Sequence, residues 1–374
     1  MKKMILLAGF TSLLQVAFGQ TDEISAAVNW VNKNTIPIDF VKAGNGFGDI
    51  EPLNALVGNA RIVALGECTH GSSEVFSMKH RMLEFLVKEK GFTIFSIEAN
   101  MPEAYSLNEY IINGKGDAKK LLSGMYFWTW YTQEVLDMIE WMKTYNETAV
   151  NKIMFTGFDM QIPKIALINV RKYLEMNKPQ LLNAINEYDS LYKTGGSIKN
   201  FWKKKSKRLI EITQTITDSL NGMPDSKEKR WILQNIKILA QNAGLFGKES
   251  YRDECMAANA KWILDENPNA KMVLWAHNEH IRKMKNKFGV ERMGSWLANW
   301  YGNQFIAIGF ATEEGTYTAV GKDNHVDSAN VLTPSKKGSC EYILKQANAA
   351  NFIIDLRKAK KGDAGTDGYL SKLQ

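Results

Sequence analysis

Acidic and imidazole side chains follow two hydrophobic runs of this sequence, at the points where buried β-strands would end. Glu67 and His70 come after Ile62–Leu65, and Glu98 directly follows the run Thr93–Ile97. A neutral imidazole accepts a proton near neutral pH, and a neighbouring carboxylate orients the ring and stabilises the cation that forms. These three residues therefore supply a candidate general base together with its orienting groups.

A second polar strand end carries two more histidines. His277 and His280 follow the hydrophobic run Lys271–Ala276. Paired imidazoles polarise an ester carbonyl or move protons, but together with Glu67 they also form a set of possible metal ligands. The two histidines directly follow a strand, which differs from the His-Glu-x-x-His helix of zinc proteases. Both interpretations stay open: a catalytic pair without a cofactor, and a divalent-metal site.

Several other chemistries lack their sequence signatures. The chain has no Gly-x-Ser-x-Gly elbow, no Walker A sequence and no Gly-x-Gly-x-x-Gly after a strand, which disfavours serine hydrolases and nucleotide binding. Cys68 lies in the polar turn beside His70, so it is either a nucleophilic thiol or, as we favour, a small residue packed beneath the turn. The three cysteines are far apart in sequence and do not form a disulfide framework.

An aromatic segment precedes a predicted amphipathic helix within Gly124–Asn146. Such a cluster either fills the core or forms one wall of a pocket for a large amphipathic ligand. Its members are Tyr126, Phe127, Trp128, Trp130 and Tyr131.

Strand-like and helix-like segments alternate over most of the chain. This alternation predicts an α/β fold with a mostly parallel sheet, flanking helices and functional groups at the carboxyl ends of the strands. A polar turn is expected over Thr312–Thr318. The runs that predict strands are Ile62–Leu65, Thr93–Ile97, Lys152–Asp159, Lys271–Ala276, Gln304–Ala311 and Phe352–Leu356.

The middle of the chain changes character. Residues 163–250 lack strand signals and show helical periodicity with many lysine, asparagine, glutamate and glutamine residues. We expect a helical insertion over the cleft of the sheet, acting either as a lid or as a structural layer. The predicted organisation is a signal peptide over 1–19, a lead-in segment over 20–60, a first core part over 61–162, the insertion over 163–250 and a second core part over 251–374.

The N-terminal segment has the pattern of a secretory signal. Lys2 and Lys3 precede the apolar segment Met4–Phe18, and small residues precede a cleavage point before Gln20. We therefore expect a periplasmic or secreted protein. No later segment is apolar enough to predict a membrane span. The formal charge of +7 comes from scattered basic residues, a pattern that does not favour nucleic-acid binding.

Several linked motifs resemble those of the erythromycin esterase family. In chain order the matching pieces are LGECTHGSSE, KHRMLEFLVKEKGFTIFSIEA, WTWYTQEVLDMIEWMKTYN, TGFDMQ, YRDECMAANAKWIL, VLWAHNEHI, MGSWL and AIGFATEEGTYTA. They extend over most of the chain, including the helical middle. The resemblance implies an α/β core with a helical portion over the cleft. It also implies hydrolysis of the lactone ester of macrolides, which inactivates these antibiotics.

The resemblance also implies roles for the polar residues. His70 would be the general base, with Glu67 and Glu98 orienting the ring or the attacking water. His277 and His280 would bind the substrate or stabilise the oxyanion. No cofactor is needed for such a reaction.

The resemblance further implies substrate contacts. Lys79 stands where some macrolide esterases have an arginine, and it lacks the planar fork of donors of that residue. Two alternatives stay open: an exported protein that binds a metal or haem through the same imidazoles, and an esterase for an envelope polysaccharide or another metabolite. The residues expected to contact a small-molecule ester are Lys79, His80, Tyr126, Trp128, Trp130, Asp159 and Arg252.

Overall fold

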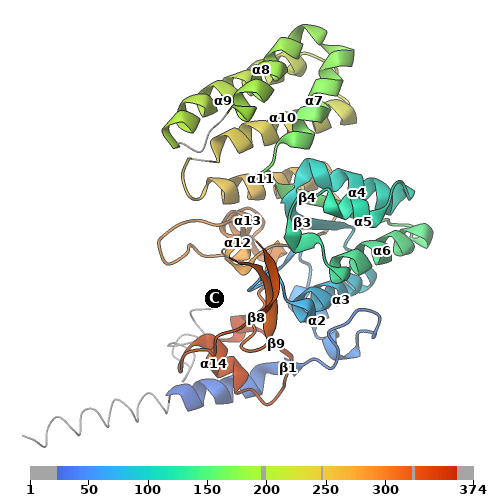
Figure 1. Ribbon diagram of the computed structural model, residues 1–374. Helices are drawn as coiled ribbons and strands as arrows, with labels where there is room; N and C mark the ends of the chain where they lie inside the picture. Colours follow the sequence, from blue (N-terminus) through green and yellow to red (C-terminus); the bar gives the residue numbers. More distant parts are fainter. Residues whose placement is uncertain (1–22, 195–198, 246, 322–324, 360–374) are drawn as a thin grey trace, which may run out of the picture. The chain divides into compact units, whose positions relative to one another are not determined.

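The computed structural model describes residues 23–194, 199–245, 247–321 and 325–359 (Figure 1). The predicted signal peptide over residues 1–19 lies outside the described residues. The described residues fall into two compact units. The first unit is drawn from Met1–Asn59, Glu67–Phe85 and Gly309–Gln374, and the second from Ala60–Gly66 and Leu86–Ile308.

A five-stranded parallel sheet forms the centre of the second unit. Its strands are β2 (Ile62–Leu65), β3 (Ile94–Asn100), β4 (Met154–Asp159), β5 (Met272–Trp275) and β6 (Phe305–Ile308). They lie in the order β4-β3-β5-β2-β6. Every residue of β2 and β5 is buried, which explains why their sequences are continuous hydrophobic runs. The predicted α/β fold with a mostly parallel sheet is confirmed.

Helices connect the strands of this unit. They are α4 (Met101–Asn113), α5 (Ala118–Ser123), α6 (Gln133–Thr148), α11 (Tyr251–Asp265), α12 (Asn278–Ile281) and α13 (Met293–Tyr301), with 3₁₀ turns η2 (Trp128–Trp130) and η4 (Gly302–Gln304). α6 begins where the Thr132 hydroxyl accepts a hydrogen bond from the Val135 backbone, and α4 ends at a left-handed Gly114. α12 packs tightly against the end of β2, because a Cβ at Gly66 would lie 2.0 Å from the Asn278 side-chain oxygen.

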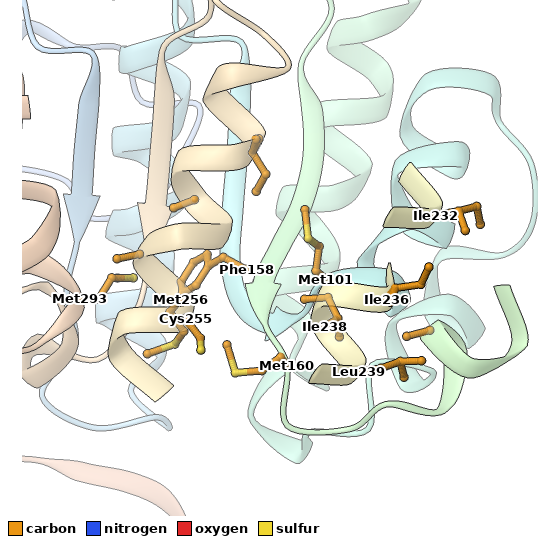
Figure 2. Packing of buried hydrophobic residues seen from close by; sticks show 14 of the residues in the cluster. Met101, Phe158, Met160, Ile232, Ile236, Ile238, Leu239, Cys255, Met256 and Met293 are labelled. Atoms are coloured by element: carbon orange, nitrogen blue, oxygen red, sulfur yellow. The ribbon is translucent and has the colours of Figure 1, made fainter. Parts of the chain in front are cut away.

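The segment over residues 163–250 contains only helices and connecting turns wherever the structure describes it, as predicted. Its elements are α7 (Lys164–Asn177), η3 (Pro179–Leu181), α8 (Leu182–Lys193), α9 (Lys199–Asn221) and α10 (Lys227–Gly244). Figure 2 shows Ile238 of α10 in the same buried cluster as Met101. The Asn242 side chain donates to the carbonyls of Met160 at 3.1 Å and Gln161 at 2.8 Å. The insertion therefore contacts the chain just beyond the carboxyl end of β4.

The first unit is built from smaller elements. Residues 23–34, within the predicted lead-in segment, form a helix. The other elements are β1 (Thr35–Pro37), η1 (Gly48–Ile50), α2 (Leu53–Val57), β7 (Thr316–Val320), β8 (Val326–Val331), α14 (Cys340–Lys345), β9 (Phe352–Ile354) and η5 (Leu356–Lys358). α3 (Ser73–Lys90) begins in this unit and continues into the second. Among the described residues, no helix combines the length and the apolar character that crossing a membrane requires.

Two expectations for the C-terminal part are corrected. The final predicted strand forms as β9, but it pairs antiparallel with β1 and does not join the parallel sheet. The expected turn over Thr312–Thr318 becomes a strand from Thr316 onwards, and β7 pairs antiparallel with β8. Threonine and tyrosine favour extended backbone even in a polar segment, so polarity alone was a poor guide there.

Candidate active site

The first unit joins Glu67, His70 and Lys79 in one hydrogen-bonded group. Nδ1 of His70 lies 2.6 Å from one Glu67 oxygen, and the Lys79 ammonium donates to the other at 2.7 Å. Glu67 and Lys79 are completely buried, whereas the His70 side chain is 41% exposed. The buried Glu67–Lys79 ion pair thus fixes one edge of the imidazole, and the rest of the ring is partly exposed at the surface of this unit.

Burial and charge act in opposite directions on Glu67. Burial raises the pKa of a carboxyl group, but here the Lys79 ammonium and the His70 hydrogen bond outweigh it and lower the pKa of Glu67 to about 2. The ionised carboxylate can only accept, so it fixes the proton of a neutral His70 ring on Nδ1. The ring lone pair then lies on Nε2, the atom suited to accept a proton from water.

The turn that precedes α3 is held against β7. Gly71 accepts a backbone hydrogen bond from Thr318 at 3.0 Å, and a Cβ at Gly71 would lie 2.1 Å from the Thr318 carbonyl oxygen. α3 then brings Lys79 back to the carboxylate, while the neighbouring His80 is also buried. Burial raises the pKa of the Cys68 thiol, so its neutral and weakly nucleophilic form dominates.

In the second unit, Arg252 holds two carboxylates at the carboxyl ends of β3 and β4. Its guanidinium donates to Glu98 at 2.7 Å and to Asp159 at 2.7 and 3.2 Å. Burial disfavours the guanidinium charge, but the two carboxylates outweigh it and raise the pKa of Arg252 above its usual range. Arg252 and Asp159, both predicted to contact substrate, therefore contact each other, and Asp159 is completely buried.

His280 lies between two carboxylates from different elements. Its Nδ1 is 2.7 Å from Asp253, and its Nε2 is 3.4 Å from Glu98 and 3.2 Å from an Arg252 nitrogen. Asp253 is buried in the first turn of α11 and is not among the residues that the sequence predicts for the site. A signal was present, because an Arg-Asp pair begins the helix that leads into β5.

His277 precedes the short helix α12. Its backbone N–H donates to Glu98 at 3.0 Å, and its Nδ1 accepts from the Glu279 backbone at 3.3 Å. An accepting Nδ1 places the proton of the neutral ring on Nε2. Three predicted residues, Glu98, His277 and His280, thus lie together at the carboxyl ends of β3 and β5.

The predicted aromatic contacts divide between core and surface. Trp130 is buried, and its ring packs edge-on against Trp275 of β5 with centroids 5.8 Å apart. Tyr126 is 39% exposed and has a positive φ of 66°, and its ring centroid lies 5.6 Å from the Lys164 ammonium. Trp128 is half-buried. Tyr126 and Trp128 therefore keep surface that a ligand can cover.

The metal alternative has a divided ligand set. His277 and His280 belong to the second unit and Glu67 to the first. Within the part of the chain that the structure describes, no group of three or more histidine, cysteine, aspartate or glutamate side chains is arranged to hold a metal ion. The catalytic and metal-binding roles of these residues stay predictions.

Comparison with known proteins gives a consistent result. A family model described as erythromycin esterase matches residues 87–370. The chain is 25% identical to YbfO of Bacillus subtilis, named as a hydrolase, over 89% of this chain and 82% of that protein. It is 24% identical to erythromycin esterase type II of Escherichia coli, over 88% of each. The fold is shared with a solved mutant of the erythromycin esterase EreC in its open conformation, with a TM-score of 0.67 at 19% identity over 82% of this chain and 85% of that one.

Proposed function

The chain belongs to the erythromycin esterase family, and we propose that it opens the lactone ring of macrolide antibiotics with a water molecule activated by His70. Membership of this family and the similarity to the relatives described above indicate that the chain is a hydrolase. The macrolide substrate and the role of His70 are proposals.

The contact between Glu67 and His70 carries this proposal. Water gives a proton to Nε2 of His70 while its oxygen attacks the ester carbonyl, and Glu67 stabilises the imidazolium that forms. The carbonyl carbon then releases the ring oxygen, which takes up a proton, and the product is an open-chain hydroxy acid. Lys79 keeps the pKa of Glu67 low, so the proton stays on the imidazole.

In the proposed mechanism, residues of the second unit stabilise the negative charge that develops on the substrate. His277 and His280 bind the carbonyl or stabilise the oxyanion, which is commonly a large contribution to acyl-transfer catalysis. Glu98 orients the water, and the guanidinium of Arg252 fixes the position of this carboxylate.

The substrate class is supported by the aromatic surface. Tyr126 and Trp128 offer partly exposed rings, which suit a large and mostly apolar macrolide. Cleavage of the predicted export signal before Gln20 would place the enzyme in the periplasm or outside the cell. There it would inactivate macrolides before they reach the cytoplasm, and so contribute to antibiotic resistance.

The test is a hydrolysis assay. Purified protein is incubated with macrolides of different ring sizes and with simple carboxylic esters, and mass spectrometry follows the addition of one water. His70→Asn should lower kcat by about 10²–10⁴-fold with unchanged thermal unfolding, because a general base contributes that much. His325→Asn changes an exposed histidine of the same unit and should leave kcat unchanged.

Other results of these assays would change the proposed substrate or the proposed mechanism. Hydrolysis of simple esters alone would keep the esterase and remove the macrolide, and no hydrolysis of any ester would contradict the proposal. Equal rates for His70→Asn and wild type would remove His70 from the mechanism. Activity that is lost on chelation and restored by a divalent cation would favour the metal-dependent alternative.

A further inference from the structure

The buried carboxylate of Asp253 contacts the His280 ring and accepts hydrogen bonds from two further donors. Its Oδ1 accepts from the Met293 backbone at 3.0 Å and contacts Nδ1 of His280 at 2.7 Å, while Oδ2 accepts from Arg292 at 3.3 Å. The side chain is 2% exposed. These bonds come from the start of α13 and from α12, so the carboxylate has one fixed position against the imidazole.

This geometry determines which nitrogen of His280 carries the proton. A carboxylate offers acceptors only, so the Nδ1 that faces Asp253 is the protonated one. The other nitrogen, Nε2, faces Glu98 and Arg252. A neutral ring accepts from Arg252 at Nε2, whereas a protonated ring donates from Nε2 toward Glu98.

The charged groups around the ring favour its protonated form. Burial lowers the pKa of a histidine, but the carboxylates of Glu98 on β3 and Asp253 on α11 outweigh it and raise the pKa of His280. Arg252 on α11 opposes them, although its charge is shared between Glu98 and Asp159. Arg292, at the start of α13, also lies near the ring, and its positive charge is shared between Asp253, Glu279 of α12 and Glu249.

We propose that Asp253 is the positioning residue that makes His280 a proton donor, an inference that rests on the proposed ester hydrolysis. Asp253 holds one proton on Nδ1 and leaves the second on Nε2. When the C–O bond of the tetrahedral intermediate breaks, this Nε2 proton passes to the leaving ring oxygen, which becomes the hydroxyl group of the product. The neutral ring then regains a proton from solvent.

The first test observes the wild-type protein and needs no substrate. The chain has five histidines, so ¹⁵N-histidine labelling gives a simple NMR spectrum in which His280→Gln identifies the His280 signals. In the wild-type protein the neutral His280 ring should carry its proton on Nδ1, and its titration midpoint should lie above the ordinary histidine value of about 6.5. A neutral ring protonated on Nε2, or a midpoint below that value, would overturn the inference.

The second test compares two aspartates of α11. Asp253→Asn should lower the His280 midpoint, reduce kcat by about 10²-fold or more with little change in KM, and move the alkaline limb of the pH–rate profile to lower pH. Asp253→Glu should restore part of kcat. Asp265→Asn removes an exposed carboxylate that pairs with Lys261 on the same helix, and it should change none of these quantities.

The two tests separate this inference from the proposed function. In one outcome the protein hydrolyses no ester and still shows the expected His280 titration and its change in Asp253→Asn. In that case Asp253 still determines the protonation of the His280 ring, and only the proposed ester hydrolysis fails. A protein that hydrolyses esters with an unchanged His280 titration in Asp253→Asn overturns the inference alone.

Discussion

Two of the carboxylate–imidazole pairs among the described residues have nearly the same spacing and very different surroundings. Glu67 and His70 in the first unit are 2.6 Å apart, and Asp253 and His280 in the second unit are 2.7 Å apart. The imidazole of the first pair is 41% exposed, and its carboxylate is neutralised by a buried lysine. The imidazole of the second is 15% exposed and also faces a second carboxylate.

The difference shows that a carboxylate–histidine contact does not define a role by itself. Where a lysine takes up the carboxylate charge and the imidazole is partly exposed, the ring suits proton acceptance. Where a second carboxylate faces Nε2, the pKa of the ring rises and the ring suits proton donation. Acid and base roles within one enzyme are commonly separated by such environments.

The largest expected effect comes from breaking the first pair. Glu67→Gln leaves the Lys79 ammonium buried without its carboxylate, which should destabilise the fold by about 3–5 kcal/mol. The same change removes the group that fixes the His70 tautomer, so kcat should fall by about 10²-fold or more. Chemical denaturation and ester hydrolysis measure the two effects separately.

A double-mutant cycle sharpens this prediction. Glu67→Gln combined with Lys79→Met replaces the buried ions by neutral groups, so it should recover part of the stability but none of the activity. The exposed pair of Lys143 and Glu147 is the matched control, and its cycle should show a coupling of about 0.5 kcal/mol or less. Equal coupling in both cycles would contradict the importance of burial for the first pair.

The elements that the sequence predicts best are those bounded by local signals. β2 over Ile62–Leu65 matches its predicted limits, because it is a continuous hydrophobic run that ends at Gly66. Asp253 could not be predicted in the same way, since its partner His280 is 27 residues away and approaches it only through the placement of α12. The burial of Trp130 likewise depends on its packing against Trp275 of a distant strand.

Stability should depend on pH in opposite ways at the two pairs. The pKa of Glu67 falls from 4.5 to about 2 on folding, so its contribution of about 3 kcal/mol is present above pH 4.5 and is lost as the pH falls toward 2. The pKa of His280 rises on folding, so its contribution is present below its unfolded value and is lost as the pH rises through the folded value.

Denaturation at several pH values measures this contrast. The stability difference between wild type and Glu67→Gln should shrink on acidification, and the difference between wild type and His280→Gln should shrink as the pH is raised. If the stability difference changed with pH in the same direction for both variants, the contrast between the Glu67–His70 pair and the Asp253–His280 pair would not hold.

The smallest expected effects come from two glycines, one near each pair. A Cβ at Gly71 would lie 2.1 Å from the backbone oxygen of Thr318, and a Cβ at Gly294 would lie 2.1 Å from that of Ile281, in the helix that carries His280. Replacement of either glycine by alanine should cost about 1–3 kcal/mol, since the backbone must move. Gly48→Ala, where a Cβ would meet nothing within 4 Å, is the control.

These glycine variants separate the two pairs without removing any reacting group. Gly71→Ala displaces the turn that carries His70, so kcat should fall while the alkaline limb of the pH–rate profile keeps its position. Gly294→Ala displaces α12 relative to Asp253, so the alkaline limb should move to lower pH as His280 loses part of its carboxylate contact. If Gly71→Ala moved the alkaline limb and Gly294→Ala did not, the donor would be His70, and the assignment of acid and base would have to be reversed.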